Sequence, residues 1–180
     1  MSALGIRLYG DPILARKTRP ALLPSEREVV AELARNLFDT MEAFGGVGLA
    51  ANQAGVGLRV AVIRIPPKEG PGIQAVLVNP VIVSGEGLQT GEEGCLSFPG
   101  LILKIRRFAK VKVHSLDQRG LPLETNAEGF FARALQHEID HLDGKVFIER
   151  LPLLARLRLK PELTRLKKEW LRRFNNLYLA

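Results

Sequence analysis

The sequence predicts an α+β fold with the order helix, several strands, helix, and a further helix at the C-terminus. Two observations support this. Valine- and isoleucine-rich runs follow one another between residues 59 and 125, and helical periodicity is confined to the stretches on either side of them. Strands that are gathered together, rather than alternating one by one with helices, are typical of α+β proteins and argue against a βαβ array.

The first predicted helix opens after residue 24. Ser25 and Glu28 have the spacing of a capping box, in which each side chain bonds the other residue's backbone N–H. Gly45 and Gly46 are expected to end the helix. Its buried stripe is predicted to consist of Val30, Leu33, Leu37 and Met41, with Phe44 close behind.

The strands are predicted from their β-branched residues. They cover 59–65, 74–83, 109–116 and 121–125, and a turn at 117–120 precedes the last of them. Residues 129–142 are predicted to form the second helix, with Gly144 as its C-terminal cap. One face of this helix carries apolar residues that lead up to two histidines. That face consists of Phe130, Ala134, His137 and His141.

The second helix contains the segment HEIDH at residues 137–141. Histidines four residues apart leave the same face of a helix about one turn apart, so His137 and His141 can bind a single metal ion. Glu138 is then placed beside the ion, where a carboxylate can take a proton from the water that the metal activates. The alternative is two surface histidines on an ordinary helix.

Cys95 is the only cysteine in the chain, which excludes an intramolecular disulfide and indicates a reducing compartment. As a thiolate it would complete a Cys/His/His set and leave a fourth position for water, as catalytic zinc sites do. Taken alone, it could equally be a small buried apolar residue. The third histidine, His114, lies in an alternating run and is expected to be an exposed cross-strand residue.

A glycine-rich segment, GVGLAANQ at residues 46–53, follows the first helix. Glycines allow the backbone to approach a ligand closely, so this segment can expose N–H and C=O groups to one. It is neither a P-loop nor a GxGxxG fingerprint. A close-packed turn between helix and strand explains the segment equally well when it is taken alone.

Together, GVGLAANQ (46–53), EGCLS (93–97) and QHEIDHLDG (136–144) resemble the three motifs of the peptide deformylase family, in the same order. The opening GDPILARKTRP is also similar to the N-terminal segment of that family. The resemblance implies antiparallel sheets packed around the HExxH helix. It also implies a hydrolase that removes the N-formyl group from nascent formyl-methionyl peptides. The segment 98–104 departs from other members because it lacks an arginine, so no substrate contact by that arginine is carried over.

The resemblance also implies roles for individual residues. One divalent ion, expected to be Fe²⁺ with Zn²⁺, Ni²⁺ or Co²⁺ able to replace it, would be held by Cys95, His137 and His141. Glu138 would be the general base and then the general acid. The Gln53 amide and the Leu96 backbone N–H would stabilise the oxyanion. The expected substrate contacts are Gly48 for the peptide backbone, with Val47 and Phe130 for the first side chain.

Two other functions fit parts of the sequence. An HExxH metallopeptidase would need a third ligand downstream of the helix, where no histidine exists but Glu149 and Glu162 do. A non-catalytic ribosome- or RNA-binding protein with a structural metal site would explain the basic C-terminus, but it would not explain Glu138 or an open coordination position.

The length of 180 residues predicts one catalytic domain, 1–180. The N-terminus has no apolar signal-peptide core, and no apolar run approaches the ~20 residues of a membrane span. We therefore expect a cytoplasmic protein without a membrane partner.

The positive charge is concentrated in the last 31 residues. Residues 150–180 hold nine basic and two acidic residues, while the other 149 hold 17 of each. Pro161 suits a first helical turn, so residues 161–175 are predicted to form an amphipathic helix. Its apolar stripe is Leu163, Leu166, Trp170 and Phe174, and its cations are Arg165, Lys167, Lys168, Arg172 and Arg173. The stripe can dock on the domain while the cations contact a ribosome.

Overall fold

The computed structural model describes residues 4–67 and 72–178, with side chains up to residue 172. The helices are α1 (Arg27–Ala43), α2 (Gly129–Leu142), α3 (Leu153–Arg158) and α4 (Lys160–Tyr178). The strands are β1 (Gly48–Ala50), β2 (Val60–Ile65), β3 (Ile73–Glu86), β4 (Gln89–Gly94), β5 (Ile102–Arg107), β6 (Lys110–Leu116) and β7 (Pro122–Glu128). None of these helices combines the length and apolar character that a membrane crossing requires.

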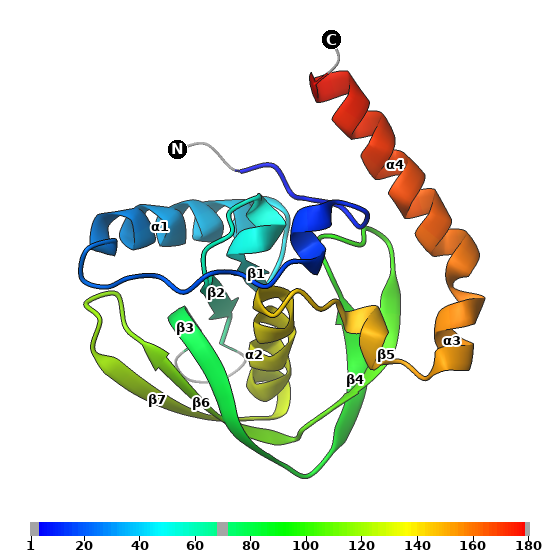
Figure 1. Cartoon of the computed structure of the whole chain (residues 1–180). Coiled ribbons are helices and arrows are strands. Elements are labelled where there is room, and N and C mark those ends of the chain that lie inside the picture. Colours follow the sequence, from blue (N-terminus) through cyan, green and yellow to red (C-terminus); the bar gives the residue numbers. More distant parts are fainter. Residues whose placement is uncertain (1–3, 68–71, 179–180) are drawn as a thin grey trace.

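The strands form two antiparallel sheets around α2 (Figure 1). The larger sheet has the order β1-β2-β3-β6-β7, and β4 and β5 form the smaller sheet. The long strand β3 shifts register against β6 between Val78 and Val81 and again between Ile82 and Ser84. Such irregularities bend a strand, which helps the large sheet to curve around the helix. The predicted α+β fold is confirmed.

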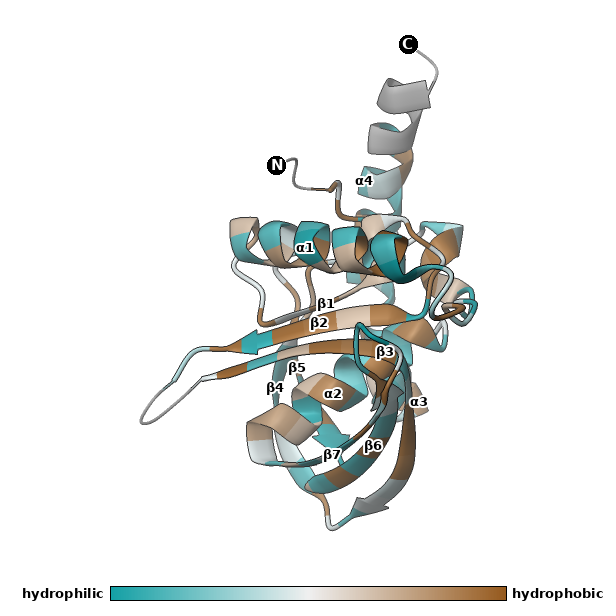
Figure 2. Cartoon of the chain, turned by 90° about the vertical axis from the view of Figure 1, so that its left-hand side faces the viewer, coloured by the Kyte–Doolittle hydropathy of each residue, from teal (hydrophilic) through white to brown (hydrophobic). Residues whose placement is uncertain are grey.

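The strand β2 separates the two main parts of the core because its successive side chains point to opposite faces. Val60 and Val62 pack with the buried stripe of α1, whereas Ile63 packs with the apolar side chains of α2. Figure 2 shows α1 on one side of β1 and β2 and α2 on the other. The glycine-rich segment that contains β1 is therefore held between the two helices.

Most of the predicted elements lie where the sequence places them. The helix predicted at 129–142 is α2, and Gly144 follows it with φ +73°, a conformation that favours glycine. The four predicted strands correspond to β2, β3, β6 and β7. The sequence analysis missed β1, β4 and β5, because β1 has three residues and β4 contains two glycines and two glutamates.

The capping box predicted for the first helix is wrong. Helix α1 begins at Arg27, and no side chain caps its N-terminus. The Ser25 hydroxyl donates to the Leu22 carbonyl instead. The Glu26 carboxylate accepts hydrogen bonds from Arg19 and from the Leu22 backbone N–H. These local bonds close a turn at the position where the capping box was expected.

Helix α4 docks on the rest of the chain through its apolar stripe. Leu166 is fully buried and packs in a cluster with Phe98, Ile105 and Phe147, and Leu163 lies against the same cluster. The Trp170 ring N–H donates to the Asp11 carboxylate at 3.3 Å. The side chains of Arg173 and Phe174 lie outside the described residues. The remaining predicted cations of this helix are exposed.

Arg59 links three segments of the core and is almost completely buried. Its guanidinium donates to the Pro80 carbonyl at 2.7 Å and to the Leu142 carbonyl at 3.3 Å. It also pairs with the Asp143 carboxylate at 2.8 Å. The C-terminus of α2 is thereby fixed to β3, next to the position where β3 bends.

Arg59→Ala is expected to lower the free energy of unfolding by about 2–3 kcal/mol, because it removes the guanidinium donors of the Pro80 carbonyl and the charge partner of the Asp143 carboxylate. Urea denaturation at a fixed metal concentration measures this. The control is Arg35→Ala, which removes an exposed guanidinium from α1. Equal unfolding free energies for the two variants would contradict the linking role of Arg59.

Candidate metal centre and cavity

Three potential ligand atoms converge where the end of β4 meets α2. Cys95 directly follows β4, and His137 and His141 lie one turn apart on α2. The His141 Nε2 lies 3.2 Å from the Cys95 Sγ and 3.3 Å from the His137 Nε2. All three donor atoms lie within 4.8 Å of one another. The two separated motifs of the sequence thus form one candidate metal site.

The 3.3 Å between the two imidazole nitrogens fits a tetrahedral metal ion, whereas the Cys95 sulfur lies slightly closer to His141 than in such a set. Metal–nitrogen bonds of ~2.0–2.1 Å and a metal–sulfur bond of ~2.3 Å give separations of about 3.3 Å between two nitrogens and about 3.6 Å between sulfur and nitrogen. Burial lowers the pKa of His141 well below its ordinary value, so this imidazole is neutral and offers a lone pair. A thiolate and two imidazoles suit a divalent transition metal.

The Glu93 carboxylate orients the first histidine. Its Oε2 lies 3.0 Å from the His137 Nδ1, which leaves the His137 Nε2 facing Cys95 and His141. Arg107 binds the same carboxylate with two hydrogen bonds, of 2.7 and 2.9 Å. Burial by itself would raise the pKa of Glu93, but hydrogen bonds from His137 and Arg107 lower it to about 2. Glu93 is therefore ionised when it meets the imidazole.

A chain of paired charges continues from the buried Arg107 to the exposed Arg150. The third guanidinium nitrogen of Arg107, Nη1, donates to the Asp140 carboxylate at 2.7 Å, and Arg150 donates to the same carboxylate at 3.0 Å. Sequence reasoning missed these roles. Glu93 and Asp140 lie inside the motifs that it quoted, but their partner Arg107 lies outside all three. The available signal in the sequence was an acidic residue close to each candidate metal ligand, Glu93 near Cys95 and Asp140 next to His141.

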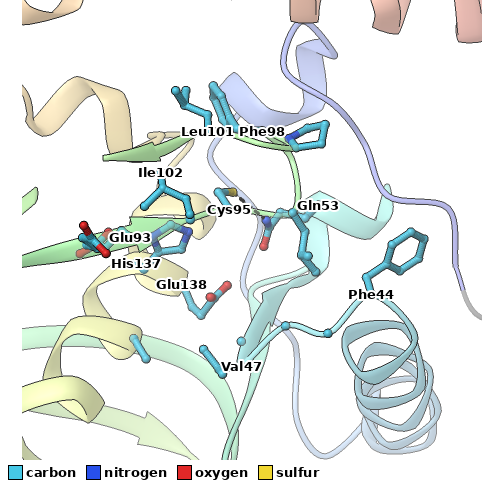
Figure 3. Close-up of a pocket in the computed structure, with 18 of the residues that line it drawn as sticks. Phe44, Val47, Gln53, Glu93, Cys95, Phe98, Leu101, Ile102, His137 and Glu138 are labelled. Atoms are coloured by element: carbon cyan, nitrogen blue, oxygen red, sulfur yellow. Dashed lines mark hydrogen bonds and ion pairs between the residues drawn. The ribbon is translucent and has the colours of Figure 1, made fainter. Parts of the chain in front are cut away.

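Glu138 points into the cavity beside His137 and Cys95 (Figure 3). It is 4% exposed, and its Oε2 has no hydrogen-bond partner among the described residues. Burial raises the pKa of this carboxyl to about 7. Gly48 lies directly against it, since a Cβ at Gly48 would come within 2.9 Å of the Glu138 carboxyl carbon. The Glu138 carboxyl can therefore occupy this place only because residue 48 is a glycine.

The Gln53 amide has one orientation fixed by its neighbours. Its oxygen accepts a hydrogen bond from the Ala50 backbone N–H at 2.9 Å. Its nitrogen lies 3.2 Å from the Ser97 hydroxyl and 3.4 Å from the Cys95 Sγ. The amide nitrogen of Gln53 is therefore directed toward Ser97 on one side and toward Cys95 of the candidate metal site on the other.

A cavity of about 550 Å³ opens onto this site. Among its lining residues are Val47, Gly48, Leu96, Phe130 and most of the polar residues just described. Phe130 and Val47 are 51% and 37% exposed, so they lie nearer to solvent than Glu138 does. Of the nine predicted site residues only His141 does not line the cavity, and it is buried behind His137.

The other candidate ligands of the sequence lie elsewhere. His114 is exposed on β6 and lies opposite Glu124 on β7, as expected for a cross-strand residue. Glu149 accepts a hydrogen bond from the Val146 backbone N–H, and Glu162 pairs with Arg165 on α4. Neither glutamate belongs to the candidate metal site. Glu149 and Glu162 therefore do not supply the downstream third ligand that a metallopeptidase would need.

Glu93→Gln is expected to weaken metal binding by about 10–100-fold, as loss of a partner behind a metal-bound histidine typically does. The amide keeps the size of the side chain but loses the charge that faces His137. Competition with a chelator measures the dissociation constant without reference to activity. Glu92→Gln, a change at the exposed neighbouring residue, is the matched control. Equal affinities in both variants would contradict the orienting role.

Comparisons with known proteins agree with this geometry. The model of the family described as polypeptide deformylase matches residues 3–156. A peptide deformylase of Elusimicrobium minutum is 43% identical over 175 residues, covering 94% of this chain and 99% of the relative. A peptide deformylase of Aquifex aeolicus is 48% identical over 147 residues, covering 81% and 86%.

Solved structures give the same result. The crystal structure of peptide deformylase from Thermus thermophilus is similar with a TM-score of 0.82 and 42% identity, over 92% of this chain and 98% of that chain. A peptide deformylase from Legionella pneumophila has a TM-score of 0.82 and 40% identity, over 95% and 99%. The chain belongs to the polypeptide deformylase family and is a metal-dependent hydrolase that removes the N-formyl group from nascent polypeptides.

Proposed function

We propose that Cys95, His137 and His141 hold the metal ion and that the residues around them deformylate formyl-methionyl peptides, releasing formate. The main support is that the oriented Gln53 amide, the buried Glu138 carboxyl and the three candidate ligands meet at the inner end of one cavity. When bound, a divalent ion supplies a Lewis acid that polarises the formyl carbonyl and makes a water acidic enough to ionise near neutral pH.

Glu138 is the proposed general base and acid. Its carboxylate takes the proton of the attacking water and then gives it to the departing amine of the methionine. The unpartnered Oε2 is free to accept that proton. Burial raises the pKa of this carboxyl toward neutral pH, where a group can both take up and release a proton.

Gln53 and Leu96 are the proposed donors to the oxyanion. The Gln53 amide is oriented by the Ala50 N–H and by Ser97, so the N–H that faces Cys95 is already close to the place where charge develops on the formyl oxygen. The Leu96 backbone N–H lies next to the ligand Cys95. Loss of one such donor typically costs ~10²–10³ in rate.

The substrate is proposed to lie along β1. Gly48 would bond its backbone, and Val47 and Phe130 would flank the methionine side chain at the cavity. Fe²⁺ is the proposed native metal, on the family resemblance, with Zn²⁺, Ni²⁺ or Co²⁺ able to replace it. The proposed place of action is the cytoplasm, where nascent formylated chains occur and where a lone cysteine stays reduced.

Formate release from formyl-Met-Ala-Ser tests these roles, with protein purified without oxygen. Glu138→Gln is expected to lower kcat by about 10²–10⁴-fold while one equivalent of metal stays bound, because the variant loses proton transfer but no ligand. Metal content measured on the same samples is the control for the site. Either a metal-loaded wild type that releases no formate or a fully active Glu138→Gln protein would overturn the proposal.

We also infer that residues 1–180 form one catalytic domain and that the basic helix at 161–175 contacts the ribosome. The apolar stripe of α4 is occupied by docking, which leaves its exposed cations available for phosphate groups. Lys167, Lys168 and Arg172 are all exposed, whereas Arg165 pairs with Glu162. The N-formyl-methionyl chain emerges from the same particle, so this contact would bring the enzyme to its substrate.

Replacing Lys167, Lys168 and Arg172 by glutamine is expected to weaken co-sedimentation with ribosomes. The salt dependence should also fall, by roughly 0.7–0.9 in slope for each phosphate group that the variant no longer neutralises. The matched control replaces three exposed cations elsewhere, Lys17, Arg35 and Lys104. Indistinguishable binding by the two triple variants would rule out a specific contact through α4.

A further inference from the structure

The cavity has room for more than the formyl-methionyl residue. Its volume of about 550 Å³ lies within the ~300–1,000 Å³ of clefts that bury a drug-sized ligand. The polar residues of the proposed chemistry line its inner part. Val47 and Phe130 are already assigned to the first side chain. The lining residues that remain at the mouth are therefore available to the part of the peptide that follows methionine.

Two exposed apolar side chains stand at that mouth. Phe44 directly follows α1 and is 53% exposed, and Ile102 opens β5 and is 66% exposed. Both line the cavity, and Figure 3 places them on opposite sides of Gln53. Single exposed apolar residues are ordinary, but apolar residues gathered around one cavity mark a binding surface.

The part of segment 98–104 that lines the cavity is apolar. The segment 98–104 contributes Phe98, Pro99, Gly100 and Leu101 to the lining in addition to Ile102, and none of these five residues is charged. Arg133, the cation that lines the cavity, is largely buried, and its guanidinium bonds the Glu92 carbonyl and lies 3.7 Å from the Glu93 carboxylate. It is thereby turned toward the protein.

We propose that Phe44 and Ile102 form the contact surface for the residue after methionine, so that the enzyme prefers substrates with an apolar second residue. The inference rests on the proposed function. In an extended peptide, successive side chains point to opposite sides. When the methionine side chain enters between Val47 and Phe130, the next side chain is directed back toward the mouth. There it removes apolar surface from water together with Phe44 and Ile102.

The test compares kcat/KM for formyl-Met-Leu-Ser, formyl-Met-Asn-Ser and formyl-Met-Gly-Ser. Leucine and asparagine have similar size, so their ratio isolates apolar character. The wild type is expected to favour the leucine peptide by about tenfold over both others, the lower end of what an apolar pocket discriminates. In the double variant Phe44→Ser, Ile102→Ser this ratio should fall to within about twofold. Leu88→Ser, which removes an equally exposed leucine that does not line the cavity, should keep the wild-type ratio.

The outcomes separate this inference from the proposed function. Formate released at equal kcat/KM from all three peptides by the wild type overturns the inference and leaves deformylation standing. A leucine preference that survives in the double variant also overturns it, because the preference would then arise elsewhere. The absence of formate from every peptide overturns the proposed function and the inference with it.

Discussion

The candidate metal centre depends on the ion pairs that the buried Arg107 guanidinium makes with two carboxylates. The guanidinium is held on one side by Glu93 of β4 and on the other by Asp140 of α2. The smaller sheet is thereby joined to the helix by charge rather than by apolar packing alone. Cys95 follows Glu93 by two residues, so fixing this strand against α2 also fixes the thiolate against the two imidazoles. Removal of one partner would leave a buried charge uncompensated, which is costly.

The second constraint is the alternation of side chains in the larger sheet. Because Val62 faces α1 and Ile63 faces α2, the strands β1 and β2 are covered on both sides. This sandwich leaves no space between Gly48 and Glu138 for even a methyl group. The packing of the core and the position of the proposed base are therefore set by two paired strands, β2 and β1.

The sequence predicted the fold class, α2, most strands and the nine candidate site residues, because periodicity, β-branched runs and three short motifs are local signals. The structure brings these nine residues to one site, and their roles stay proposals. Contacts between distant segments were not predictable. Arg107 gave no local sign that it would pair with Asp140, 33 positions later. The cap of α1 was predicted wrongly because Ser25 and Glu26 both bond to the preceding turn. The Ser25 hydroxyl donates to Leu22, and the Glu26 carboxylate accepts from Arg19 and Leu22.

The strand β1 is at the edge of the larger sheet, since it pairs with β2 alone in the sheet order. Val47 and Gly48, at its beginning, also line the cavity. An edge strand presents backbone donors and acceptors to which an extended peptide can add as a further strand. Such recognition reads the main chain, which is the same in every newly made protein. A single enzyme that bound its substrates in this way could act on a whole proteome, and the proposed contacts at the mouth would only adjust how fast each member is processed.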